Sequence, residues 1–169
     1  MIGNFKEEIA RIRAFVFDVD GVFTDARILI TPSGEFLREY NMRDGLAVVR
    51  AIQKGYPIAI ISGGRGNQLR QRMEGLGIRH IYMGQESKME ALLHFAAESG
   101  VPLEEMLYMG DDVPDIEPMR AVRIAVAPSD ADSMVKGVVH YVSAFGGGRG
   151  CVRDIVEQVL RARGDWFTC

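Results

Sequence analysis

Six short, mostly apolar runs divide this chain, and segments with helical periodicity separate them. The runs are AFVFDV (14–19), PIAIIS (57–62), HIYMG (80–84), MLYMG (106–110), RIAVA (123–127) and HYVSA (140–144). Because most are apolar at consecutive positions rather than at alternate ones, they are typical of strands that are buried on both faces. The sequence therefore predicts an α/β fold, with a Rossmann-like parallel sheet covered by helices on both faces.

Helices are expected near residues 44–54, 67–76, 87–99, 114–120, 130–136 and 150–163. The last shows the clearest pattern, because its apolar residues fall on one helical face: Val152, Ile155, Val156, Val159 and Leu160. No repeat, low-complexity tract or linker interrupts the 169 residues. We therefore expect one domain over residues 1–169.

The segment FTDARILITPSGEFLREYNM (23–42) departs from this alternation. It contains two short apolar stretches around TPSGE, in which Pro32 favours a turn and Gly34 can adopt a left-handed conformation. This pattern predicts an inserted β-hairpin. An ordinary hairpin at the edge of the sheet is the alternative to a functional insertion.

Composition and charge exclude several classes of protein. A formal net charge of −3 offers no basic face for nucleic acid. No apolar run approaches the roughly 20 residues that span a membrane, and the start MIGNFKEEIARIR lacks the apolar core of a signal peptide. The two cysteines, Cys151 and Cys169, form neither a disulfide framework nor a metal cluster. We expect a cytoplasmic protein that binds neither nucleic acid nor membranes.

Polar side chains follow four of the predicted strands. In chain order they are Asp18 and Asp20, then Ser62, then Lys88, then Asp111, Asp112 and Asp115. Ligands of open parallel sheets bind outside the carboxyl ends of the strands, so these groups are expected to meet in one crevice. Crowded carboxylates repel each other unless a cation neutralises them, and hard oxygen ligands suit Mg²⁺.

The chemistry that fits this set is phosphoryl transfer. One carboxylate can attack phosphorus and form an aspartyl phosphate. A second carboxyl group can protonate the leaving oxygen and later activate water. Ser62 and Lys88 can bind the remaining phosphoryl oxygens, and Gly21 lets backbone N–H groups approach the phosphate.

Other patterns fit less well. A calcium loop places its glycine at the sixth position, whereas DVDG has it at the fourth. The stretch GGRGN lacks the third glycine of a dinucleotide-binding turn, because Leu69 stands there. A phospho-receiver domain gathers similar groups, but its acidic pair comes first and its phosphoacceptor stands alone in mid-chain.

These motifs resemble the haloacid dehalogenase superfamily of phosphatases. The resemblance implies Asp18 as the nucleophile and Asp20 as the general acid and base. It also implies that Mg²⁺ is held by Asp18, by the backbone carbonyl of Asp20 and by Asp111. Asp112 and Asp115 would orient Lys88 and the metal's waters.

A narrower resemblance covers nearly the whole chain. DVDGVFTDARI, NMRDGLAV, LGIRHIYMGQESK and GGRGCVRDIVEQVL are similar to the 3-deoxy-D-manno-octulosonate 8-phosphate phosphatase family. This family lacks a large cap domain and forms homotetramers through its hairpins, and the tail of one subunit reaches the next. The resemblance implies a phosphorylated sugar acid as substrate, in lipopolysaccharide precursor synthesis.

The same resemblance implies a set of substrate-binding residues: Gly21, Asn41, Met42, Arg43, Asp44, Gly45, Gly63, Gly64, Arg65, Arg72 and Arg149. Arg65 and Arg72 share a helical face if the helix begins early enough, whereas Arg70 is expected to be a solvated surface charge. One position departs from the family. An arginine usually follows its Ser/Thr-Gly pair, and a sister branch acting on 2-keto-3-deoxynononate 9-phosphate carries an acidic residue there, but this chain has Gly64. The missing acid favours the eight-carbon substrate.

Two functions of other classes remain open. A scaffold that has lost catalysis would lack at least one of Asp18, Asp20, Lys88 or Asp111, and all four are present. A nucleotide-binding module would be stabilised by nucleotide without releasing phosphate. The leading prediction is a Mg²⁺-dependent sugar-acid phosphatase.

Overall fold

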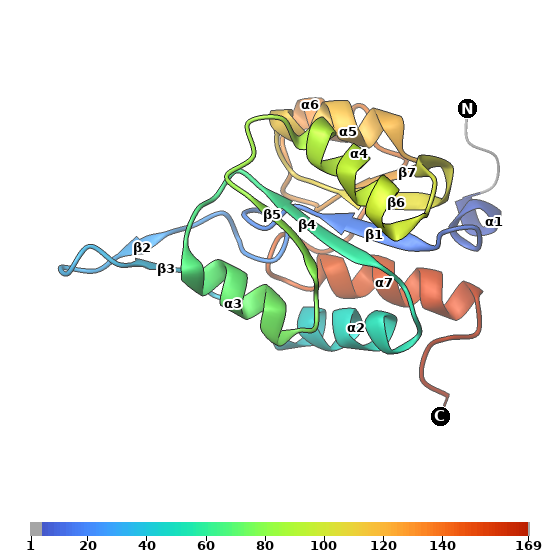
Figure 1. Ribbon diagram of the computed structural model, residues 1–169, viewed down its shortest axis with the longest axis horizontal. Helices are drawn as coiled ribbons and strands as arrows, with labels where there is room; N and C mark the ends of the chain where they lie inside the picture. Colours follow the sequence, from blue (N-terminus) through green and yellow to red (C-terminus); the bar gives the residue numbers. More distant parts are fainter. Residues whose placement is uncertain (1–4, 169) are drawn as a thin grey trace.

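The computed structural model describes residues 5–168 as a six-stranded sheet between two layers of helices, with a hairpin that projects to one side (Figure 1). The strand order is β5-β4-β1-β6-β7-β8, and every neighbouring pair is parallel. The strands are β1 (Ala14–Phe17), β4 (Ile58–Ser62), β5 (His80–Met83), β6 (Met106–Met109), β7 (Ile124–Ala127) and β8 (Tyr141–Val142). The predicted α/β fold with a parallel sheet is confirmed.

Helices cover both faces of this sheet, α2, α3 and α7 on one side and α4, α5 and α6 on the other (Figure 1). Their bounds are α1 (Phe5–Ile9), α2 (Met42–Gln53), α3 (Asn67–Gly75), α4 (Lys88–Ser99), α5 (Ile116–Ala121), α6 (Ser133–Lys136) and α7 (Cys151–Ala162), with 3-10 turns at Leu103–Glu105 and Val113–Asp115. None of the helices formed by residues 5–168 combines the length and apolar character needed to cross a bilayer. The same residues contain no capping domain, as predicted.

Strand β1 lies at the centre of the sheet and contributes to both hydrophobic cores. Phe15 and Phe17 pack into the core on the α2 and α7 side, while Ala14 and Val16 face the core on the α4 side. All four side chains are fully buried. Successive side chains of a strand point to opposite faces of the sheet, and helices cover both faces here. Every position of β1 is therefore apolar, and the carboxylates begin only where the strand ends.

Three predicted elements differ from the observed ones. Helix α2 begins at Met42 rather than at residue 44, because the Asn41 side chain accepts a hydrogen bond from the Arg43 N–H at 2.8 Å and caps the helix. Helix α6 is shorter than predicted and begins after Asp132, whose carboxylate accepts the Met134 N–H. The predicted helix 114–120 is divided into a 3-10 turn and α5, with Pro114 in the first turn.

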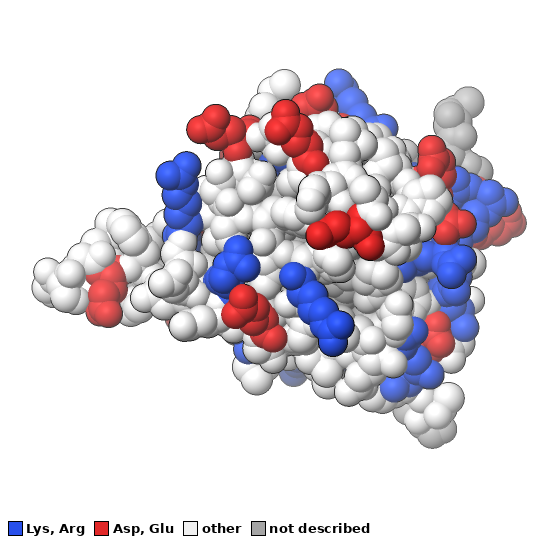
Figure 2. All heavy atoms as spheres, viewed as in Figure 1, with Lys and Arg blue, Asp and Glu red and all other residues white. Residues whose placement is uncertain are grey.

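The predicted hairpin exists, but it does not join the main sheet. Strands β2 (Leu29–Ile30) and β3 (Phe36–Leu37) pair only with each other, so the interpretation as an edge hairpin is wrong. Its tip is closed by the Gly34 N–H, which donates to the Thr31 carbonyl oxygen, with Gly34 at φ +83°. The hairpin extends away from the body and is mostly uncharged on the face seen in Figure 2.

The C-terminal tail docks on its own chain rather than fraying. Trp166 is 6% exposed and belongs to the core on the α2 and α7 side. The Tyr56 hydroxyl donates to the Asp165 carboxylate at 2.7 Å, and Arg50 donates to the Asp165 carbonyl oxygen. Tyr56 precedes β4, so within this chain the tail lies at the opposite end of the sheet from Ser62. The alternative of a frayed tail is therefore wrong, and entry of the tail into a neighbouring subunit's site stays a prediction.

Replacing Trp166 with alanine is expected to reduce the free energy of unfolding by about 3 kcal/mol, because it empties a buried aromatic site. Phe167→Ala is the matched control, since Phe167 is 44% exposed and its loss is expected to cost about 1 kcal/mol or less. Urea denaturation of both variants measures the difference. Equal losses would show that Trp166 does not contribute to the core.

Candidate active site

The polar groups predicted from the strand ends meet in one cavity. Asp18 directly follows β1, Ser62 ends β4, Lys88 begins the helix after β5, and Asp111 lies two residues beyond β6. The cavity has a volume of about 370 Å³. It is lined by Asp18, Asp20, Ala26, Ser62, Gly63, Gly64, Gln85, Glu86, Lys88, Asp111, Asp112 and Pro114. The structure thus brings together the groups expected to act on a phosphoryl group.

A buried ammonium group links two of the carboxylates. The Lys88 Nζ lies 2.9 Å from Asp18 Oδ2 and 2.8 Å from Asp115 Oδ1, and its side chain is 8% exposed. Burial alone lowers the pKa of Lys88, but the two carboxylates outweigh it and raise the pKa. Lys88 therefore remains a charged donor that fixes the position of Asp18.

Asp115 has both carboxylate oxygens occupied. Oδ1 accepts hydrogen bonds from Lys88 and from the Tyr108 hydroxyl, each at 2.8 Å. Oδ2 accepts the backbone N–H groups of Asp111 and Asp112 at 3.3 and 3.4 Å. Asp115 can therefore orient its neighbours. Tyr108 was not predicted as part of the site, because its apolar strand position marks it only as a core residue.

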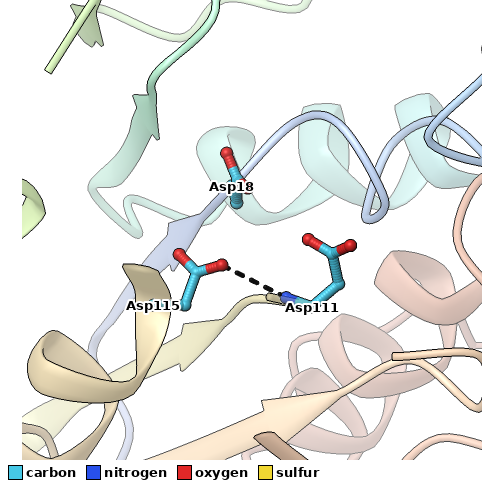
Figure 3. A group of neighbouring side chains, drawn as sticks. All are labelled: Asp18, Asp111 and Asp115. Atoms are coloured by element: carbon cyan, nitrogen blue, oxygen red, sulfur yellow. Dashed lines mark hydrogen bonds between the residues drawn. The ribbon is translucent and has the colours of Figure 1, made fainter. Parts of the chain in front are cut away.

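Three carboxylates from the segments that follow β1 and β6 stand close together (Figure 3). Asp18, Asp111 and Asp115 each offer an oxygen atom within 4.8 Å of the others. Burial and the charge of Asp115 raise the pKa of Asp18 to about 7, although Lys88 and the Val19 N–H act in the opposite direction. Burial and the charges of Asp18, Asp115 and Asp112 likewise raise the pKa of Asp111 to about 7. The cluster thus holds more negative charge than its protein neighbours compensate.

This donor set fits a hard divalent cation. Asp111 Oδ1 is buried and has no hydrogen-bond partner among the described residues, which is costly unless another group binds it. Gly21 lies so close that an added Cβ would meet the Asp111 carboxylate, and its φ is +87°. A bulkier residue at position 21 would therefore displace a carboxylate of the cluster.

The motif around Ser62 has a tight backbone. Ser62 Oγ accepts the Gly64 N–H at 3.0 Å, and Ser62 is buried. A Cβ at Gly64 would lie 3.2 Å from Ser62 Oγ and 3.3 Å from Asp20 Oδ2. Arg65 precedes α3 and packs against Gly84 instead, so Arg65 and Arg72 do not share a helical face.

A second cavity holds other residues predicted to bind substrate. It has a volume of about 670 Å³ and is lined partly by Asn41, Arg43 and Arg149. Arg149 is well exposed and lies 3.8 Å from Asp25. Met42, the first residue of α2, is 75% exposed. In a single chain these residues do not line the cavity that contains Asp18.

Asp44 has a structural contact where a substrate contact was predicted. Its side chain is fully buried, and Oδ1 accepts the Arg153 N–H at 2.7 Å. Gly150, the residue before α7, has no side chain to cap the helix, so Asp44 supplies the cap from α2. This burial gives Asp44 a structural role within the chain, and its contact with substrate stays a prediction.

Gly45 and Arg72 meet at the junction of α2 and α3. Gly45 is buried, and a Cβ there would lie 3.1 Å from the Arg72 guanidinium. Arg72 also lies over the Tyr40 ring, 5.6 Å from its centroid. Arg70, predicted as a solvated surface charge, is exposed, but it donates to the Ile81 carbonyl oxygen.

The glycine segment 146–150 packs against the turn that follows β1 and carries Asp20. The Gly148 N–H donates to the Val22 carbonyl oxygen at 2.9 Å, and a Cβ at Gly147 would collide with the backbone of Gly21. The Gly147 N–H in turn donates to Asp130. The composition GGGRG allows two backbones to pack directly against each other.

The chain resembles known enzymes over most of its length. A family model described as haloacid dehalogenase-like hydrolase matches residues 74–146. The 3-deoxy-D-manno-octulosonate 8-phosphate phosphatase of Yersinia pestis is 37% identical over 157 residues, which cover 93% of this chain and 84% of that protein. The phosphatase of the same name from Escherichia coli strain K12 is 35% identical over 153 residues, 90% of this chain and 81% of that protein.

Solved structures agree with these relatives. The crystal structure of the Yersinia pestis phosphatase has a TM-score of 0.92 at 36% identity, over 95% of this chain and 86% of that one. The phosphatase from Moraxella catarrhalis, solved in complex with a magnesium ion, a phosphate ion and KDO, has a TM-score of 0.91 at 30% identity. The match covers 95% of this chain and 92% of that one.

The fold, the site and these matches define a haloacid dehalogenase-like hydrolase, an enzyme of the phosphoric monoester hydrolase class. Within that class the chain belongs to the family of the 3-deoxy-D-manno-octulosonate 8-phosphate phosphatases.

Because the Asp44 carboxyl group is buried, the stability of the protein is expected to depend on pH. Burial raises the pKa of Asp44 from 3.8 to about 6, although the Arg153 and Gly150 N–H groups act in the opposite direction. The Asp44 carboxyl group therefore binds a proton more tightly in the folded state than in the unfolded state. The bound proton stabilises the folded state fully below pH 4, and this stabilisation is lost as the pH rises through 6. Relative to Asp44→Asn, the free energy of unfolding of the wild type is expected to fall by roughly 2–3 kcal/mol across this pH range.

Urea denaturation of the wild type and of Asp44→Asn at several pH values between 4 and 7.5 measures this difference. Glu104→Gln is the control, because Glu104 is exposed and its variant should track the wild type at every pH. A pH-independent difference for Asp44→Asn would contradict the buried-carboxylate interpretation.

Proposed function

We propose that this enzyme is a Mg²⁺-dependent phosphatase that hydrolyses 3-deoxy-D-manno-octulosonate 8-phosphate to the free sugar acid and phosphate. The observation that supports the proposal most strongly is the buried Asp18, which lies 2.9 Å from Lys88 and shares a cluster with Asp111, whose Oδ1 has no partner among the described residues. The reaction belongs to lipopolysaccharide precursor synthesis and takes place in the cytoplasm, a location consistent with the free, buried thiol of Cys151.

The proposed reaction has two steps. Asp18 attacks phosphorus, the bond to the sugar oxygen breaks, and Asp20 protonates that oxygen as it leaves. Asp20 then takes a proton from water, which attacks the aspartyl phosphate and releases phosphate and free Asp18. Lys88, Ser62 and the N–H groups after Ser62 bind the phosphoryl oxygens. Asp18, the Asp20 carbonyl oxygen and Asp111 would hold Mg²⁺, which supplies positive charge opposite the phosphate.

The nucleophile and the metal are tested by phosphate release. Asp18→Asn is expected to remove nearly all turnover, and Asp20→Asn to reduce it about 10²–10⁴-fold, because the leaving oxygen is no longer protonated. Chelation should abolish activity, and added Mg²⁺ should restore it. Near-normal phosphate release by folded Asp18→Asn, or full activity after exhaustive chelation, would contradict the mechanism. No phosphate release by the wild type in the presence of Mg²⁺ would favour the non-catalytic alternatives.

The eight-carbon substrate is proposed over the nine-carbon alternative, 2-keto-3-deoxynononate 9-phosphate. A side chain at position 64 would start 3.3 Å from Asp20 Oδ2, at the site itself, and this chain has neither an acidic nor a basic group there. Arg65 packs against Gly84 and does not occupy that space.

The ratio of kcat/KM for the two sugar-acid phosphates tests this choice. The wild type is expected to favour the eight-carbon substrate, and Gly64→Glu is expected to lower that ratio even if both activities fall. A wild-type ratio that favours the nine-carbon substrate would assign the enzyme to the sister branch.

We also propose a homotetramer formed through the hairpins. Leu29, Ile30 and Phe36 are 67%, 62% and 56% exposed on a two-stranded sheet with free edges. Asn41, Arg43 and Arg149, which are predicted to bind the sugar acid, line a different cavity from Asp18. A neighbouring subunit is therefore proposed to complete the binding site for the sugar.

Light scattering tests this assembly. The wild type is expected to be a tetramer at micromolar concentration, and Leu29→Glu a smaller species with a raised KM. Leu93→Glu is the control, because Leu93 is 49% exposed on α4, outside the hairpin, and should leave the tetramer intact. A monomeric wild type would contradict the proposed assembly.

A further inference from the structure

A side chain from the base of the hairpin reaches the proposed general acid and base. Arg38 directly follows β3, and its Nε lies 2.7 Å from Asp20 Oδ1 while its terminal nitrogen Nη2 lies 3.2 Å from Asp20 Oδ2. The Arg38 side chain is 13% exposed. Among residues 5–168 the structure gives the Asp20 carboxylate no other hydrogen-bond donor.

The geometry of this contact is more restrictive than that of a simple charge pair. A guanidinium that donates to both oxygens of a carboxylate fixes the plane of the carboxylate as well as its position. Arg149 and Asp25 provide a contrast nearby, since they are 3.8 Å apart and the Arg149 side chain is 69% exposed. Such an exposed pair contributes little, whereas the Arg38 pair is short, two-point and shielded.

The orientation of the Asp20 carboxylate matters because it lies beside the loop that follows β4. Asp20 Oδ2 faces the Ser62–Gly64 loop, where a Cβ at Gly64 would lie 3.3 Å away. Asp20 lies on the 19–24 turn, in which the N–H groups of Val22, Phe23 and Thr24 all donate to the Val19 carbonyl oxygen. The backbone of Asp20 is therefore fixed by the turn, and its side chain is fixed by Arg38.

We propose that Arg38 is a positioning residue that aims the Asp20 carboxyl group at the oxygen of the leaving sugar. It follows that the hairpin contributes to the chemistry of its own subunit as well as to any assembly. This inference rests on the proposed function, in which Asp20 protonates the leaving oxygen.

Leaving groups of different acidity separate this role from a structural one. A phenolate such as that of 4-nitrophenyl phosphate leaves without needing a proton, whereas a sugar alkoxide needs one. Single-turnover release of the leaving group, measured with each substrate, therefore reports the action of Asp20 in the first step. Arg38→Met is expected to slow release of the sugar about 10–100-fold and release of 4-nitrophenol less than about threefold. Arg38→Lys, which keeps the charge but not the two-point contact, should lie between the wild type and Arg38→Met.

A double-mutant comparison makes the test specific. In an Asp20→Asn background, Arg38→Met should add almost no further loss, because the group that it positions is already inactive. Arg27→Met is the matched control, since Arg27 is an exposed arginine of the same hairpin segment and should release both leaving groups at the wild-type rate. Thermal unfolding of each variant establishes that it is folded.

These measurements distinguish failure of the proposed function from failure of the role proposed for Arg38. If Asp20→Asn slows the two substrates equally, the proposed function itself fails. If Asp20→Asn slows the sugar selectively but Arg38→Met slows both equally, or adds its full loss in the Asp20→Asn background, Arg38 is not a positioning residue. Equal effects of Arg27→Met and Arg38→Met would likewise overturn the inference.

Discussion

The ammonium group of Lys88 stands between Asp18 and Asp115, and much of the site depends on this buried contact. It joins the end of β1, the start of α4 and the 3-10 turn before α5, which are distant in the sequence. Asp115 extends the connection to Tyr108 and to the backbone of Asp111. Removing one charge from such a group leaves its partners buried and uncompensated, which costs more than the contact contributes by itself. The position of Asp18, the proposed nucleophile, is therefore coupled to both cores of the sheet.

The turn that follows β1 is supported from two further directions. The glycine segment 146–150 packs against its backbone, and α7, which follows that segment, is capped by Asp44 from α2. On the other side, Arg38 binds Asp20 from the base of the hairpin. The turn 19–24 thus lies between the helix pair α2 and α7 and the projecting hairpin. The glycine segment before α7 contacts the backbone of the turn, whereas Arg38 contacts the Asp20 side chain.

The central features of the fold and of the phosphate end of the site were predictable from sequence. Continuous apolar strands require a sheet covered on both faces, and the carboxyl ends of parallel strands lie at one edge, so Asp18, Ser62, Lys88 and Asp111 had to converge. The partners that come from distant segments were not predictable. Arg38 lies at the base of an exposed hairpin, Tyr108 lies in an apolar run and Asp44 lies in a motif that resembles a substrate loop. No local pattern reveals what each of them contacts. The place where the tail docks was not predictable for the same reason, because the sequence does not show where Trp166 is buried.

The proposed two-step mechanism depends most on the phosphorylation of Asp18. Its most direct test is to mix the enzyme and Mg²⁺ with sugar-acid phosphate labelled at phosphorus, quench with acid within one turnover, and locate the label by peptide mapping. The mechanism predicts an acid-stable, base-labile label on the peptide that contains Asp18 in the wild type, and none in Asp18→Asn. Turnover by the wild type without any label on that peptide would contradict it.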